Sequence, residues 1–243
     1  MRNRPLRTRG VKVDARNWQK IEVSDGLPLR VEQKTRPPSD SEVDKLCELT
    51  VRSEDNSKIT FKTLVNDPSY PRVITVFVRH FFCGFCEEYI KALSAELSPK
   101  TLESLSPPTK LVVIGCGDPA LIGDYKRRTS CPYELYADPS RATYDLLDFT
   151  VTLANGHKAP GYSEKSFAST VWYSFVNNLT AGSMMLSGGK RAQNGGELVW
   201  QDGKLKYICR MKTTTDHMPV AELRKVLDEQ SATAPEKDAA VVS

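Results

Sequence analysis

Two cysteines three positions apart, Cys83 and Cys86, are the residues of this sequence best suited to chemistry. If they lie on a helix, one turn separates them, and a disulfide can form with little movement of the backbone. The thiolate is the reactive form of cysteine, and a helix N-terminus favours it because unpaired amides and the macrodipole stabilise negative charge. Such a pair can cycle between dithiol and disulfide, and Arg79 and His80 just before it could add positive charge.

A zinc site and a pair of inert buried thiols are the alternatives to a redox pair. Zinc usually takes four ligands, from two such cysteine pairs or from one cysteine pair and one histidine pair. This chain has a single C-x-x-C, and its three histidines, His80, His157 and His217, are scattered along the sequence. We therefore expect no metal. A position between a strand and a helix favours a redox pair over inert thiols.

Other candidate residues carry weaker signals. Cys116 ends the next predicted strand, so it is expected at the same sheet edge as Cys83, as a spare resolving thiol or simply as a small buried residue. Arg191 could supply charge to the site or be a solvated loop arginine, and Asp216-His217 is interpreted first as a helix cap and second as a functional pair. Packing roles are expected for Cys47 and Cys131.

The elements that must position the cysteine pair alternate between strands and helices. Residues 72–79 form a short apolar, β-branched run, typical of a strand covered on both faces. Apolar residues at helical spacing follow the pair. The predicted order is a strand at 72–79, a helix at 83–97, a strand at 110–116, a helix at 119–128, a strand at 133–137 and a helix at 141–149. This order predicts a mostly parallel sheet with helices on its faces.

Further elements are predicted on both sides of this core. A helix begins at Ser39, where Glu42 completes the capping-box spacing, and a hairpin follows within 48–64. A helix is expected at 166–179. Asp202-Gly203 joins two apolar strands, 197–201 and 204–209, as a hairpin turn does. A last helix, capped by Asp216, completes the plan. The fold class is α/β, a thioredoxin-like fold with a central mixed sheet, flanking helices and a C-terminal β-hairpin plus helix.

Composition and charge set the domain limits. The chain has 243 residues, 26% of them charged, and a net charge of +4; residues 1–36 hold ten Lys or Arg against four Asp or Glu. We expect a basic, flexible tail at 1–38, a domain at 39–229 and a disordered tail at 230–243. No apolar run is long enough to cross a membrane, and no nucleic-acid reader follows the basic tail. The expected location is the cytoplasm, with a mitochondrial presequence as the alternative for the Arg-rich start.

The segment from Phe77 to Tyr89, with the sequence FVRHFFCGFCEEY, resembles the active-site segment of the peroxiredoxin-like AhpC/TSA antioxidant family. The resemblance extends over residues 39–229 and includes four further motifs, at 112–116, 136–139, 193–196 and 215–217. It implies a thioredoxin fold and an antioxidant role.

Two departures limit what the resemblance implies. Peroxiredoxins carry Pro-x-x-x-Thr/Ser-x-x-Cys, but Val76 and His80 occupy the proline and hydroxyl positions before Cys83. Thioredoxins place a cis-proline before the strand that faces the active site, and Gly195 or Gly196 stands there. The C-x-x-C and the fold agree with these families, whereas the substrate of either family cannot be carried over to this chain.

The leading hypothesis is therefore a thiol oxidoreductase. Cys83 attacks a peroxide or a disulfide, Cys86 resolves the product, and glutathione or a thioredoxin restores the dithiol. Arg79, His80 and Cys116 are supporting candidates, and no organic cofactor is implied. Two alternatives stay open: a thioredoxin-fold binding or scaffold protein without turnover, and a metabolite-tailoring enzyme on the same fold.

Overall fold

The computed structural model describes residues 18–22, 28–32, 37–154 and 187–232. Its centre is a run of three strands: β5 (Arg72–Phe77), β6 (Thr109–Gly115) and β7 (Glu134–Ala137). All three are parallel, and Val73 pairs with Lys110 in the register of β5 and β6. Every residue of β5 is buried, as its β-branched apolar sequence predicts for a strand covered on both faces.

Antiparallel strands extend this centre on both sides. β8 (Gly196–Gln201) pairs with β5, and β9 (Lys204–Arg210) pairs with β8. On the other side β3 (Thr50–Arg52) joins β7, and β4 (Lys58–Thr60) closes the edge. With β1 (Trp18–Glu22) and β2 (Pro28–Glu32), the order is β1-β2-β9-β8-β5-β6-β7-β3-β4. Parallel β5, β6 and β7 beside the antiparallel β8–β9 hairpin form the mixed sheet of the thioredoxin-like fold.

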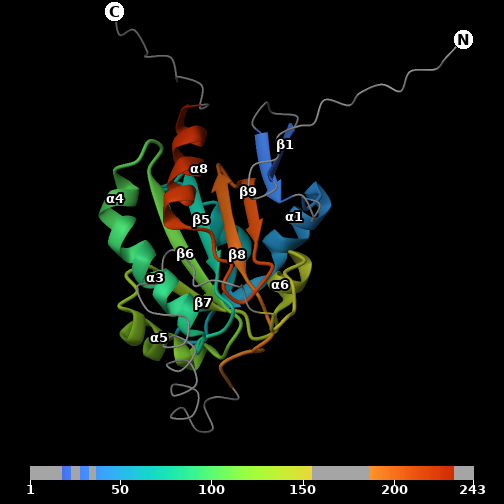
Figure 1. Cartoon of the computed structure of the whole chain (residues 1–243), viewed down its shortest axis with the longest axis vertical. Helices are drawn as coiled ribbons and strands as arrows, with labels where there is room; N and C mark the ends of the chain where they lie inside the picture. The colour runs from blue at the N-terminus through green and yellow to red at the C-terminus, as the bar shows by residue number, and fades with distance from the viewer. Residues whose placement is uncertain (1–17, 23–27, 33–36, 155–186, 233–243) are drawn as a thin grey trace, which may run out of the picture.

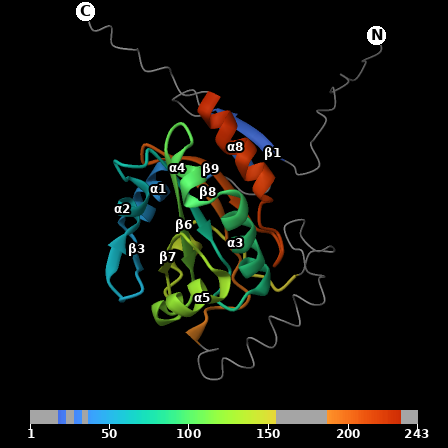
Figure 2. The same cartoon turned by 90° about the vertical axis from the view of Figure 1, so that its left-hand side faces the viewer.

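Helices cover both faces of the sheet (Figures 1 and 2). One layer holds α3 (Gly84–Glu96), α4 (Pro99–Glu103), α5 (Ile122–Thr129) and α8 (Val220–Ala232). The other holds α1 (Asp40–Glu48), α2 (Phe61–Val65) and α6 (Ala142–Leu146). A 3-10 turn, η1 (Pro119–Leu121), precedes α5. Each layer has its own apolar core, with Ile90 and Leu223 in the first and Phe61 and Trp200 in the second.

Local signals in the sequence explain several element ends. The capping box at α1 is present: the Glu42 amide donates to Ser39 Oγ, and the Ser39 amide donates to Glu42 Oε2 at 2.8 Å. The predicted hairpin within 48–64 is confirmed as β3 and β4, and the Asp202-Gly203 turn joins β8 to β9. Gly203 has a φ of +72°, which a residue without Cβ adopts at little cost.

The start of the last helix differs from the prediction. Asp216 was expected to cap it, but α8 begins at Val220, directly after Pro219. Asp216 Oδ2 instead accepts the Lys212 amide at 3.1 Å, which closes a turn in the segment before the helix. The interpretation of Asp216-His217 as a helix cap is therefore wrong, and His217 lies in another environment, described below.

Two strands lie inside the segment for which the sequence predicts only a basic tail. β1 and β2 pair antiparallel to each other, and Arg30 of β2 pairs with Tyr207 of β9. They extend the sheet beyond β9. The boundary near residue 38 stays a prediction, and the helix predicted at 166–179 lies outside the described residues. Within the described ranges, none of the helices combines the length and the apolar character needed to cross a bilayer.

Candidate active site

The cysteine pair lies where β5 leads into α3. Cys83 is the N-cap residue of α3, with an extended backbone (φ −84°, ψ 106°), and Cys86 lies in the first turn. Only 3% of Cys83 and none of Cys86 is exposed. The prediction that β5 and β6 are parallel neighbours, with Cys83 at the start of the intervening helix, is confirmed. The two sulfur atoms are not bonded, since both residues are free thiols.

The turn before Cys83 is fixed by neighbouring strands and loops. The hydroxyl of Tyr144 on α6 donates to the carbonyl oxygens of Val78 and Ile114, at 2.8 and 2.9 Å, and so joins the ends of β5 and β6. The Phe81 amide donates to the Gly188 carbonyl at 3.1 Å. The Phe81 ring lies so close to Gly115 that a Cβ there would be 2.3 Å from it. The cysteine pair therefore stands on a constrained turn.

Arg79 provides the positive charge of the site. Its guanidinium donates to Cys83 Sγ through Nη1 at 3.4 Å, to Asn194 Oδ1 through Nε at 3.1 Å, and to the Arg191 carbonyl through Nη2 at 2.6 Å. Its backbone amide donates to Cys86 Sγ at 3.4 Å. Because Arg79 is 6% exposed, its charge is little screened by water. One residue thus contacts both sulfur atoms.

The two thiols have opposite pKa shifts. Burial raises the pKa of the Cys83 thiol, but hydrogen bonding from Cys86 and the charge of Arg79 outweigh it and hold that pKa well below its ordinary value. The backbone amide of Cys86 also lowers the pKa of Cys83, by a smaller amount. Burial and the negative charge of Cys83 raise the pKa of Cys86 well above its ordinary value. The geometry therefore favours a thiolate at Cys83 and a protonated thiol at Cys86.

His80 lies in the same turn, but it does not act as the second cation. Burial lowers the pKa of His80 to about 4, so the ring is neutral at pH 7 and becomes charged only in acid. Its Nδ1 accepts the Phe82 amide at 3.3 Å, which shapes the turn just before Cys83. The positive charge expected from the sequence thus comes from Arg79 at neutral pH.

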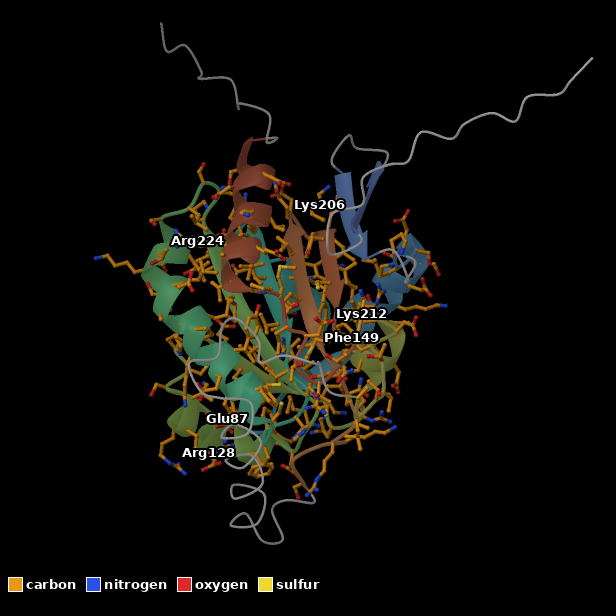
Figure 3. All side chains as sticks on the ribbon, viewed as in Figure 1. Glu87, Arg128, Phe149, Lys206, Lys212 and Arg224 are labelled. Carbon is orange, nitrogen blue, oxygen red and sulfur yellow. The ribbon has the colours of Figure 1, made fainter. Side chains whose placement is uncertain are left out.

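An ion pair anchors the first turn of α3 to α5. Glu87 is fully buried and pairs with Arg128, and the two are labelled together in Figure 3. Arg128 also donates to the Phe81 carbonyl at 2.7 Å and lies over the Phe82 ring. This contact holds the turn and the helix in fixed relative positions from the side of the helical layer.

Three further residues belong to the site: Glu197 and Asn194, which are not among the predicted candidates, and His217, which the sequence indicates only as the second interpretation of Asp216-His217. His217 Nε2 lies 3.3 Å from Cys86 Sγ, and His217 Nδ1 lies 2.7 Å from Glu197 Oε1. Asn194 holds the guanidinium of Arg79 from the loop before β8. For Asn194 and His217 a signal is present, because the motifs at 193–196 and 215–217 belong to the quoted resemblance, whereas Glu197 lies one residue beyond the first motif. Cys86 and His217 are 131 residues apart in the sequence, so no local pattern indicates their contact.

The remaining predicted candidates lie apart from the reactive sulfur atoms. Cys116 is buried and its thiol donates to the Arg79 carbonyl at 2.9 Å, while burial raises the pKa of Cys116 to about 11. That environment suits a small buried residue next to the turn better than a resolving thiol. The Arg191 side chain is exposed, and only its carbonyl joins the site. Burial likewise raises the pKa of Cys131 to about 11.

Gly195 and Gly196, one of which is expected from the sequence at the cis-proline position of thioredoxins, both lie in close contact with neighbouring backbone. A Cβ on Gly195 would lie 1.7 Å from the Phe77 carbonyl oxygen, and one on Gly196 would lie 2.1 Å from the Cys209 carbonyl oxygen. The backbone of β8 therefore approaches its neighbours at a distance that only glycine allows. Glu197, the next residue, lies in β8, and its carboxylate contacts His217.

The assembled groups can do thiol chemistry. A polarised sulfur at a helix N-terminus, a guanidinium beside it and a second sulfur one turn away suit attack on an electrophile followed by disulfide formation. In the part of the chain that the structure describes, no group of three or more His, Cys, Asp or Glu side chains is arranged to hold a metal ion.

Comparison with known proteins agrees with this chemistry. The family model described as AhpC/TSA antioxidant enzyme matches residues 93–213, which begin within α3 just after the cysteine pair. Peroxiredoxin-like 2C of Mus musculus is 27% identical over 188 residues, covering 76% of this chain and 80% of that protein. Thioredoxin-like protein AAED1, chloroplastic, of Arabidopsis thaliana is 28% identical over 158 residues, covering 63% and 61%.

Solved structures show more distant similarity. The reduced 2-Cys peroxiredoxin of Plasmodium vivax has a TM-score of 0.47 at 10% identity, covering 75% of this chain and 77% of that one. A secreted disulfide oxidoreductase of Mycobacterium tuberculosis has a TM-score of 0.43 at 9% identity, covering 79% and 99%.

Proposed function

Because the chain belongs to the peroxiredoxin-like AhpC/TSA antioxidant family, we propose that it is a thiol oxidoreductase that reduces peroxides or disulfides through a Cys83/Cys86 dithiol–disulfide cycle. The observation that carries the proposal is the contact of Arg79 Nη1 with Cys83 Sγ at 3.4 Å, at the N-terminus of α3. A buried guanidinium beside a sulfur atom stabilises the thiolate, which is the nucleophile that either substrate requires.

The proposed cycle begins at Cys83. Its thiolate attacks one oxygen of a peroxide; the new S–O bond forms as the O–O bond breaks, and an alcohol or water leaves. Cys86 then attacks Cys83 Sγ, the S–S bond forms and the oxygen leaves as water. The peroxide gains two electrons and the dithiol loses two. With a disulfide substrate, a mixed disulfide on Cys83 takes the place of the sulfenic acid.

Burial bears on which of the two substrate classes reacts better. Only 3% of Cys83 is exposed, so a small peroxide reaches the sulfur more readily than a protein disulfide does. The hydroxyl that peroxiredoxins place three residues before the attacking cysteine is replaced here by His80. We therefore expect Arg79, with no hydroxyl partner, to orient the peroxide.

The reductant and the location follow from the same chemistry. Glutathione or a thioredoxin attacks the Cys83–Cys86 disulfide and returns both electrons, so the proposed cycle uses sulfur alone. We propose the cytoplasm as the location, where both reductants are present. A relative from Arabidopsis thaliana carries the word chloroplastic in its name, which makes organelles the compartment to compare in localisation experiments.

The experiment uses one equivalent of peroxide, or of oxidised glutathione, on three cysteine variants. Cys83→Ser should not react, whereas Cys86→Ser should react once and retain a sulfenic acid or a mixed disulfide on Cys83. Cys131→Ser is the matched control, because that buried thiol lies outside the pair, and it should form the Cys83–Cys86 disulfide like the unaltered chain. Mass spectrometry after trapping with dimedone reads each product.

Three results would count against the proposal. An adduct on Cys86 in Cys83→Ser, with none in Cys86→Ser, would reverse the roles of the two thiols. A reaction rate that neither variant changes would remove the pair from the active site. An ordinary pKa for Cys83 in a thiol titration would favour the binding or scaffold alternative.

A further inference from the structure

Three side chains from distant parts of the chain form a buried row beneath the cysteine pair. Cys86 lies on α3, His217 lies in the segment between β9 and α8, and Glu197 lies on β8. The distances are 3.3 Å from Cys86 Sγ to His217 Nε2 and 2.7 Å from His217 Nδ1 to Glu197 Oε1. The side chains of His217 and Glu197 are both fully buried. The row leads away from the resolving thiol into the protein.

The partners of Glu197 determine which ring nitrogen of His217 carries the proton. Glu197 Oε1 faces His217 Nδ1, and Glu197 Oε2 accepts the Met218 amide at 3.4 Å. The Met218 amide can only donate, so the Glu197 carboxyl acts as an acceptor at Oε2. With Glu197 as a carboxylate that accepts at both oxygens, the ring tautomer that fits this contact carries its proton on His217 Nδ1. In the neutral ring, Nε2 is left with its lone pair directed at the Cys86 thiol.

Packing holds the ring of His217 in this orientation. The Tyr89 ring stacks on it with centroids 4.3 Å apart and an angle of 11° between the planes. Tyr89 is one turn beyond Cys86 on α3, so the same helix presents both the thiol and the stacking ring. Glu197 is fixed in turn by its place in β8, where it pairs with Val76 of β5. The thiol, the ring and the carboxylate are thus preorganised.

We propose that His217 is the general base that takes the proton of Cys86 when Cys86 attacks the oxidised sulfur of Cys83, and that Glu197 is its positioning residue. This inference rests on the proposed dithiol cycle and adds the proton path of its second step. As the S–S bond forms, the Cys86 proton moves to His217 Nε2. The S–O bond of the sulfenic acid breaks, and its oxygen leaves as water by taking back the proton held on His217 Nε2. With a mixed disulfide the S–S bond to the substrate breaks, and the leaving thiolate takes that proton and departs as a thiol, so no net proton is gained or lost.

The burial of Cys86 explains why the step needs a base. A fully buried thiol ionises poorly without help, and a thiol is a much weaker nucleophile than a thiolate. Transfer to Nε2 creates an imidazolium directly beside the Glu197 carboxylate. The buried carboxylate of Glu197 then lies next to a positively charged ring, as in a nucleophile–histidine–carboxylate triad. The arrangement therefore lowers the cost of ionising the resolving thiol at the moment of attack.

The test separates the two chemical steps in His217→Asn. An asparagine amide can still donate to Glu197 but cannot take up a proton from Cys86. The first step, formation of the Cys83 sulfenic acid with hydrogen peroxide, should keep its rate. The second step, disulfide formation, should slow by about 10²- to 10⁴-fold, so that dimedone traps a long-lived sulfenic acid. Thr213→Ala, in the same segment, is the control and should resolve at the unaltered rate.

Glu197 and the unaltered chain provide a second measurement. Nitrogen NMR of the reduced protein, which has three histidines, should show His217 with its proton on Nδ1. Glu197→Gln should give a mixture of the two ring tautomers and slow the second step about tenfold. A proton on Nε2 in the unaltered chain would contradict the proposed proton transfer from Cys86 to His217, even if His217→Asn fails to fold. An unchanged tautomer in Glu197→Gln would overturn the positioning role.

The outcomes also separate this inference from the proposed function. If the unaltered chain cycles and His217→Asn forms the Cys83–Cys86 disulfide at the same rate, the role of His217 as general base is wrong and the dithiol cycle stands. If Cys83 of the unaltered chain forms neither a sulfenic acid nor a mixed disulfide, the proposed function is wrong, and the proposed role of His217 is wrong as well.

Discussion

At the scale of single residues, the contact between Arg79 and Cys83 decides which sulfur is charged. The guanidinium is nearly as buried as the thiol, so their attraction is weakly screened. Cys86 receives only the backbone amide of Arg79 and has a raised pKa. The two sulfur atoms therefore differ in charge although they lie one turn apart.

Arg79→Met should raise the pKa of Cys83, because it removes the opposite charge beside the thiolate. The alkylation rate should fall as the pH is lowered and the thiolate is protonated, and because the pKa of Cys83 is held well below its ordinary value, the fall should begin at lower pH than for an ordinary thiol. In the variant the fall should begin at higher pH. Iodoacetamide kinetics across pH measure it, with the exposed Arg127→Met as control. An inflection that does not move would contradict the assignment.

At the scale of elements, the site depends on how closely β8 approaches β5. Gly195 touches the Phe77 carbonyl, and the residues on either side of the glycine pair, Asn194 and Glu197, contact Arg79 and His217. A small change in the position of β8 would therefore disturb both the contact of Asn194 with Arg79 and the contact of Glu197 with His217. The side chains of these two contacts come from segments far from the cysteines in sequence.

Gly195→Ala should destabilise the protein by about 3 kcal/mol or more, because a Cβ 1.7 Å from a backbone oxygen forces two paired strands apart. Gly123→Ala on α5 is the control. Its Cβ would approach only the flexible Glu54 carboxylate, and alanine favours a helix, so its stability should be equal or greater. Urea unfolding measures both. A Gly195→Ala variant as stable as the unaltered chain would show that the strands can separate without cost.

The sequence predicts the elements around the cysteine pair better than it predicts the site. β-branched strands, the Ser39 capping box and the Asp202-Gly203 turn are local signals, and each appears at the expected place. The contact of His217 with Cys86 depends on the path of residues 211–219, which no periodic pattern describes. Asp216 has the residue type of a helix cap, yet Pro219 and the turn at Lys212 displace the helix start to Val220.

At the scale of the whole molecule, one sheet serves two apolar cores. Leu46 of α1 lies in one core and Leu223 of α8 in the other, and both are almost completely buried. The strands β5, β6 and β8 contribute side chains to both cores, because successive residues of a strand point to opposite faces. Loss of packing on either face should therefore lower the stability of the whole sheet.

Leu46→Ala and Leu223→Ala should each lower the free energy of unfolding by about 2–5 kcal/mol and keep a single cooperative transition. Leu153→Ala is the control, because that side chain is 65% exposed, and it should change stability little. Thermal unfolding followed by circular dichroism and by calorimetry measures both properties. Two separate transitions would place α1 outside the domain predicted to start at residue 39.

The burial of Arg79 has a consequence for the reduction potential of the pair. When the disulfide forms, Cys83 loses its negative charge, and the partners left to the guanidinium are the neutral oxygens of Asn194 and Arg191. A buried cation without an anion is unfavourable, so the oxidised state is disfavoured relative to the dithiol. The midpoint potential is thereby raised, and a donor thiol of lower potential has a larger driving force to reduce the disulfide. The residue that activates the nucleophile also helps to return it to its reduced form.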